Sequence, residues 1–189
     1  MGKNIIKSLI FVILLTTFTI LGSTYAYFRV STSGQDNSVR SNSAKYEIIY
    51  TGGTHINGEM EVTSSKEGGY NTTVQIGVSQ NTTIPIKADI YIDITQISTN
   101  MAVEGFVWEA YRLNGTQEIF VKKGNFAGKK VGDKINVVEG FSLSQTLTPF
   151  KVYFWIDGNK TDDSIVLNSN FEGYLGAKTY QLTGDVVRN

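Results

Sequence analysis

The sequence predicts an all-β fold, a two-sheet antiparallel sandwich of jelly-roll type, over residues 44–189. Three observations lead to this prediction. Apolar and polar residues alternate with a period of two in one stretch after another. Turn signals separate these stretches, and Asn114-Gly115 is the strongest hairpin signal among them. No segment beyond residue 26 has the period of an amphipathic helix.

A signal helix is predicted ahead of the sandwich, at residues 1–26. Lys3 and Lys7 form a short positive region, residues 9–21 carry no charge, and small residues surround Ala26. This order is typical of a secretory signal peptide that is cleaved after Ala26. A retained membrane anchor is the alternative, although the uncharged run is short for a hydrocarbon core of about 30 Å.

Residues 27–43 are predicted to form an N-terminal arm. The arm begins with the strand-forming residues Tyr27, Phe28 and Val30. Residues 31–43 are polar and rich in turn formers, so we do not expect them to hold a core strand of their own. We therefore expect residues 27–32 to be free to add, as a donated strand, to the sheet of another copy.

The alternating stretches give eight strand candidates. We expect residues 106–113 and 117–122 to pair as a hairpin around Asn114-Gly115. We expect residues 150–156 to form a central strand that is covered on both faces, because aromatic residues occur at nearly every position. Residues 122–134 are predicted to be an exposed loop. The remaining candidates are residues 45–50, 54–62, 73–79, 86–95 and 171–182, the last as one strand or a bent pair.

No catalytic residue can be named from the sequence, and the protein is predicted not to be an enzyme. The one histidine, His55, lies beside a Gly-Gly turn, whereas a zinc protease of the usual kind needs two histidines on a helix. We expect no cofactor and no firm metal site. A weak calcium site is the alternative to a solvated turn for one group of oxygen ligands: Asp157, Asn159, Asp162 and Asp163.

Two surface features suggest binding partners. Five lysines are concentrated in residues 122–134, which suits either a solvated loop or contact with an anionic cell-wall polymer or a neighbouring subunit. Tyr153 and Trp155 are either a sugar-stacking platform or a core that a loop or a second chain covers. Acidic and basic residues number 17 each, so the chain has no charge excess to attract nucleic acid.

The run GSTYAYF at residues 22–28, followed by the polar arm and by Ser43-Ala44, resembles the TasA and camelysin family of exported Gram-positive proteins. The resemblance is specific over residues 3–50 and only architectural beyond them. It implies a jelly-roll-like sandwich, processing by a SipW-type signal peptidase and secretion to the cell surface or matrix. For TasA-like members it also implies fibres in which the N-terminal segment of one subunit completes the sheet of the next. The camelysins of the family are described as metalloproteases.

The sequence therefore favours a secreted structural subunit of an extracellular fibre, biofilm matrix or surface layer. Its main partner would be a second copy of itself, joined head to tail through Tyr27, Phe28 and Val30. A monomeric cell-surface binding or adhesion module is the first alternative, and a camelysin-like metalloprotease is the second.

Overall fold

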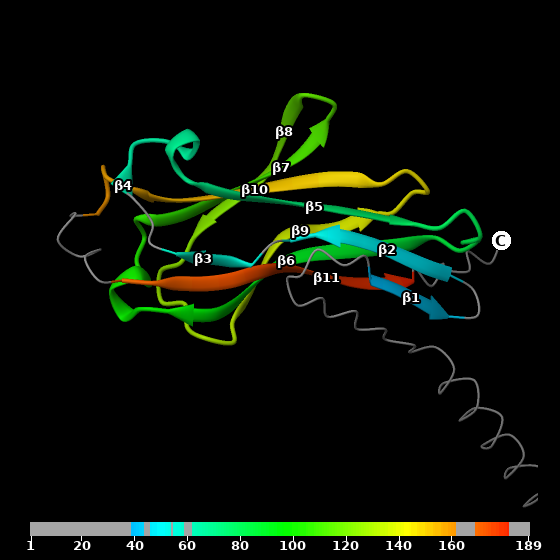
Figure 1. The fold of residues 1–189 in the computed structure, drawn as a ribbon, viewed down its shortest axis with the longest axis horizontal. Helices are drawn as coiled ribbons and strands as arrows, with labels where there is room; N and C mark the ends of the chain where they lie inside the picture. Colours follow the sequence, from blue (N-terminus) through cyan, green and yellow to red (C-terminus); the bar gives the residue numbers. More distant parts are fainter. Residues whose placement is uncertain (1–38, 44–45, 54, 59–61, 162–168, 182–189) are drawn as a thin grey trace, which may run out of the picture.

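The computed structural model describes residues 39–43, 46–53, 55–58, 62–161 and 169–181 (Figure 1). These residues form eleven β-strands in two sheets, together with two short 3-10 helices, η1 (Lys66–Gly68) and η2 (Thr99–Met101). The prediction of an all-β, two-sheet fold is confirmed for this part of the chain. No helix within it is long and apolar enough to cross a membrane. The predicted signal helix and residues 27–38 of the arm lie outside the described residues.

The larger sheet has the strand order β1-β2-β5-β10-β7-β8, and β4 pairs in parallel with the end of β10. All its other pairings are antiparallel. Strand β10 lies between β5 and β7, which confirms the central position predicted for the aromatic stretch. The strands are β1 (Val39–Ser43), β2 (Tyr46–Gly52), β4 (Val62–Thr63), β5 (Tyr70–Val78), β7 (Phe106–Asn114), β8 (Gln117–Asn125) and β10 (Thr148–Asp157).

The smaller sheet has the order β3-β11-β6-β9 and packs against the larger sheet (Figure 1). Strands β6 and β11 pair over the whole length of β11, with one irregularity between Glu172 and Gly173. The last candidate of the sequence is thus one long strand. The four strands are β3 (Ile56–Gly58), β6 (Ile86–Ile97), β9 (Lys134–Ser142) and β11 (Phe171–Gln181).

The core lies between the sheets and is built from alternate residues of each strand. Residues 86–95, predicted to be a strand, lie in β6, whose inner face is fully buried: Ile86, Ala88, Ile90, Ile92 and Ile94. One end of the core is a cluster of phenylalanines: the Phe106 ring stacks on Phe126 with centroids 4.1 Å apart, and Phe171 meets both rings edge-on. This end of the sandwich is closed by ring packing.

The prediction of an exposed loop at residues 122–134 is wrong at both ends. Strand β8 continues to Asn125, and β9 begins at Lys134. Phe126, between them, is fully buried against Phe106. The glycines and lysines suggested solvent exposure, but the apolar side chain at Phe126 anchors the start of the turn in the core.

Three further expectations need correction. Residues 39–43 of the arm form β1 on the edge of β2, because an edge strand needs only main-chain partners and tolerates polar side chains. The single strand expected at residues 54–62 is instead two short ones, β3 and β4, that belong to different sheets. Strand β9 escaped prediction because two register shifts against β6 interrupt its alternation.

The outer face of β6 is shielded from solvent at its middle, because Tyr91 and Asp93 are buried there. The ammonium of Lys134 lies 4.4 Å from the centroid of the Tyr91 ring and pairs with Asp93. Gly176 on β11 leaves the space that Tyr91 occupies, since a Cβ at that position would come within 2.6 Å of the ring. These contacts cover the middle of the smaller sheet from outside.

Candidate functional site

The residues predicted to donate a strand, Tyr27, Phe28 and Val30, lie outside the described residues, as does the cleavage site at Ala26. The surface that would pair with the donated strand, in contrast, belongs to the domain. A donated strand needs a sheet edge with free main-chain groups and apolar side chains beneath it.

Strand β11 has such an edge. Its β6 side is paired from Phe171 to Gln181, but its other side pairs only with β3, at Phe171, Glu172 and Gly173. Among the described strands, none pairs with residues 174–181 on that side. These residues therefore present an open edge long enough to hold a short strand. We call residues 174–181 of β11 the open edge.

The open edge borders the core. Leu175, Ala177 and Thr179 point inward and are buried. The Tyr50 hydroxyl donates a 2.8 Å hydrogen bond to the Leu175 carbonyl, which satisfies the first acceptor of the edge from the opposite sheet. Further along, Thr179 is only 3% exposed, and its hydroxyl has no hydrogen-bond partner within the described part of the chain. A buried hydroxyl without a partner is costly, so this end of the edge has a polar group still to be satisfied.

Strand β8 is a long edge of the larger sheet, and its two halves differ in exposure. Phe120 is 53% exposed and Val121 is 37% exposed, both near the tip of the β7–β8 hairpin, which projects from the sandwich (Figure 1). Nearer its end, Lys122 donates hydrogen bonds to the Asn136 carbonyl and to Glu139 of β9. This bridge joins the second half of β8 to β9 of the other sheet.

The outward aromatic residues of β10 are covered by a network centred on Glu118. The Glu118 carboxylate accepts hydrogen bonds from Lys66, at 2.8 Å, and from the Tyr153 hydroxyl. Lys66, on η1, also lies 3.8 Å from the centroid of the Tyr111 ring. The network therefore buries Tyr153, which is 8% exposed, and for this residue the interpretation with a covering loop fits. Trp155 lies outside the network and packs beside Tyr153 and Val107 at 9% exposure.

The same network sets the charge of Glu118. Burial alone would raise the pKa of its carboxyl, but hydrogen bonds from Lys66 and Tyr153 and the positive charge of Lys151 outweigh it and lower that pKa. A carboxyl whose pKa is lower in the folded than in the unfolded protein stabilises the fold above its ordinary pKa. That stabilisation is lost as the pH falls through the folded-state pKa.

We predict that Glu118→Gln lowers the free energy of unfolding near pH 6 and that the difference from wild type shrinks as the pH falls through the lowered folded-state pKa of Glu118. Urea denaturation at several pH values measures this. Glu139→Gln is the matched control, because the Lys122–Glu139 pair is similarly short at 2.8 Å but its side chains are 41% and 56% exposed. An equal pH-dependent loss in both variants would contradict the role of the network.

The five lysines of residues 122–134 do not form one patch in the structure. Lys122 pairs with Glu139, and Lys134 pairs with Asp93 beneath the Tyr91 ring. Lys123 lies on the outer face of β8, apart from Lys129 and Lys130 in the turn. This arrangement weakens the case for a single site for an anionic polymer.

Among the described residues, no three His, Cys, Asp or Glu side chains are grouped as a metal site would require. His55 is an exposed edge residue whose Nε2 lies 3.8 Å from a Glu172 carboxylate oxygen. Asp157 Oδ1 accepts hydrogen bonds from the backbone and side-chain amides of Asn159, both at 3.1 Å. Asp162 and Asp163 lie outside the described residues.

No family model matches the chain, and no curated protein matches it either.

Proposed function

We propose that the protein is a non-enzymatic structural subunit of an extracellular fibre, biofilm matrix or surface layer, and that it polymerises by donor-strand addition. In this proposal, residues 27–32 of one copy pair with the open edge of the next. The observation that supports it most is the open edge itself: one side of residues 174–181 has no partner strand within the described residues, and core side chains lie along it.

The chemistry of the two segments is complementary. In an extended strand Phe28 and Val30 point to one face, so both can enter the core beside Leu175 and Ala177. Burying them contributes about 1.5 to 3 kcal/mol each. Each main-chain hydrogen bond adds a net ~0.5 to 1.5 kcal/mol. A strand of this composition is thus sufficient to hold two copies together.

The chain ahead of β1 sets how far the donated strand can reach. Strand β1 fixes residue 39 on the edge of β2. Residues 33–38 then connect it to the donated strand and, fully extended, span roughly 20 Å. A contact between the arm of one copy and the edge of the next is heterologous and does not close on itself, so it propagates as a filament.

The remaining parts of the proposal rest on the sequence and the topology. The chain passes from one sheet to the other between β2 and β3, β3 and β4, β5 and β6, β6 and β7, β8 and β9, β9 and β10, and β10 and β11, which supports a jelly-roll type of sandwich. Residues 1–26 support a signal helix, export and processing by a SipW-type peptidase, with the mature protein beginning at Tyr27.

Electron microscopy of the secreted protein tests this proposal. Filaments are expected from protein that begins at Tyr27. A protein that stays monomeric under every condition, seeded or not, would favour the alternative of a monomeric surface-binding module. The groove described next is the observation that favours that alternative.

A further inference from the structure

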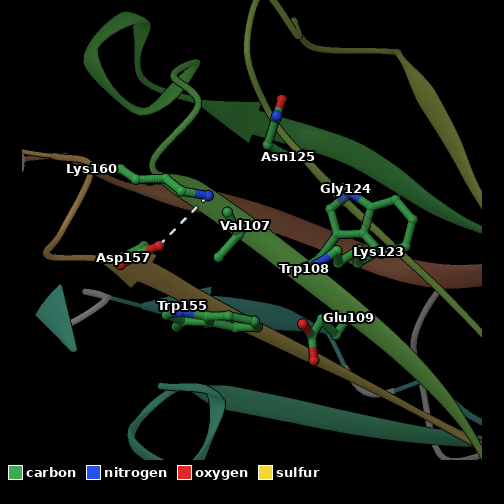
Figure 2. A pocket seen from close by; sticks show the side chains of 9 residues that line it. All are labelled: Val107, Trp108, Glu109, Lys123, Gly124, Asn125, Trp155, Asp157 and Lys160. Carbon is green, nitrogen blue, oxygen red and sulfur yellow. Dashed lines mark ion pairs between the residues drawn. The ribbon is translucent and has the colours of Figure 1, made fainter. Parts of the chain in front are cut away.

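A groove of about 410 Å³ opens on the outer face of the larger sheet, where β7, β8 and β10 lie side by side (Figure 2). Its floor is apolar. Trp155 of β10 and Val107 of β7 face each other in register, and they are 9% and 8% exposed. The volume falls within the range of small-molecule sites. The floor and volume together suit a compact ligand with one apolar face.

Trp155 packs against the residue that follows η1, and its side chain also lines the groove. Gly69 lies directly against Trp155, since a Cβ on Gly69 would come within 2.7 Å of the Trp155 Cβ. The chain at Gly69 thus packs closely against the Cβ end of the Trp155 side chain. The Trp155 side chain lines the groove, so a ligand bound there would contact it (Figure 2).

The rim of the groove is polar and carries no net charge. Glu109 and Lys123 face each other in register across β7 and β8, and Asp157 and Lys160 lie 3.7 Å apart at the other end. Two carboxylates and two ammonium groups cancel, so the groove has no charge excess to attract a polyanion or a polycation. Donors and acceptors nevertheless surround the apolar floor on both sides.

Part of this hydrogen-bonding capacity is unused. Lys123 forms no ion pair within the described residues, and it is exposed. Asn125, on the same rim, accepts a 3.0 Å hydrogen bond from the Ala127 amide through Oδ1, which leaves its own N–H groups as donors. The Glu109 carboxylate is held by the Tyr111 hydroxyl and keeps an oxygen for a further donor. These groups are positioned for a ligand with several hydroxyls.

We propose that this groove binds one neutral hexopyranose unit of a polysaccharide. The C–H face of the ring, which is weakly positive, would lie on the negative face of the Trp155 indole. Lys123 and Asn125 donate to ring hydroxyls, and Glu109 accepts from one. A peptide strand does not suit this place, because β7 and β10 are paired on both sides here. This inference is independent of polymerisation, since the groove and the open edge belong to different sheets.

Titration of the exported protein with cellotetraose, maltotetraose and tetra-N-acetylchitotetraose, followed by calorimetry and tryptophan fluorescence, tests the proposal. At least one of them is expected to bind saturably and to change the fluorescence. Lys123→Gln should weaken binding about tenfold or more. Lys130→Gln, which removes an exposed lysine from the neighbouring turn, should leave it unchanged.

Trp155→Phe should weaken binding and reduce the fluorescence change. The remaining change would come from Trp108, which is 2% exposed and also lines the groove. Circular dichroism checks whether the Trp155→Phe variant folds. If that variant does not fold, Glu109→Gln takes its place in the binding test. The proposal is overturned if none of the three sugars binds saturably, or if Lys123→Gln and Lys130→Gln lose equal affinity. Binding only to poly(glycerol phosphate), with steep salt dependence, would also overturn it in favour of a polyanion surface.

Discussion

The double substitution Phe28→Asp and Val30→Asp is expected to abolish filament growth while the sandwich stays folded. Both residues would enter the core next to Leu175 and Ala177, which are buried. An unpaired carboxylate there costs several kcal/mol. Two such sites cancel the gain from burying Phe28 and Val30 and from the main-chain hydrogen bonds. Assembly should therefore fail outright.

The control adds the same two carboxylates to the opposite face of the donated strand, as Arg29→Asp and Ser31→Asp. That face points to solvent in the proposed arrangement, so filaments should still form. Negative-stain microscopy and size-exclusion chromatography measure assembly, and circular dichroism measures folding. If the Phe28/Val30 variant loses its fold, the arm belongs to the sheet of its own subunit. If it polymerises like wild type, residues 27–32 are not the donated strand.

Phe126→Ala is expected to lower the free energy of unfolding by about 3 to 5 kcal/mol. Its ring is fully buried, stacks on Phe106 at 4.1 Å and meets Phe171 edge-on at 5.0 Å. Removing it leaves a cavity at the closed end of the core. For a chain of this length the melting temperature should fall by roughly 6 to 20 °C.

Phe120→Ala provides the comparison, because Phe120 lies on β8, six residues earlier, and is 53% exposed. Its effect should stay within about 0.5 kcal/mol. Chemical denaturation of both variants measures the difference. Similar losses in the two variants would show that residues 122–134 are not anchored in the core through Phe126.

Much of the fold follows from local sequence because alternation reports burial. Strand β6 and strand β10 were predictable from their apolar faces, and the β7–β8 hairpin from Asn114-Gly115. Strand β9 was not, since register shifts against β6 disturb the alternation that marks a strand. Strand β1 was not either, because its pairing with β2 uses main-chain groups that the side chains do not reveal.

The candidate sites depend on contacts between distant residues, so the sequence indicates them only in part. The composition of residues 27–32 suggested a donated strand, but the open edge follows from the short pairing of β3 with β11, which no local pattern encodes. Trp155 was recognisable as an outward aromatic residue. Its partners in the groove are brought together by the register of β7, β8 and β10.

Cysteine cross-linking tests the central claim most directly, because the chain has no cysteine of its own. Arg29→Cys places a thiol on the outward face of the donated strand, and Lys178→Cys places one on the outward face of the open edge. Tyr174→Cys and Tyr180→Cys cover neighbouring registers, and Lys130→Cys in the exposed turn is the control.

We expect the Arg29→Cys protein, mixed with one of the open-edge variants under mild oxidation, to form disulfide-linked heterodimers. Their yield should be well above the yield from a mixture of the Arg29→Cys and Lys130→Cys proteins. Non-reducing electrophoresis and mass spectrometry of the linked peptides identify them. Heterodimers no more frequent than with Lys130→Cys, for all three positions of the open edge, would contradict the proposed assembly.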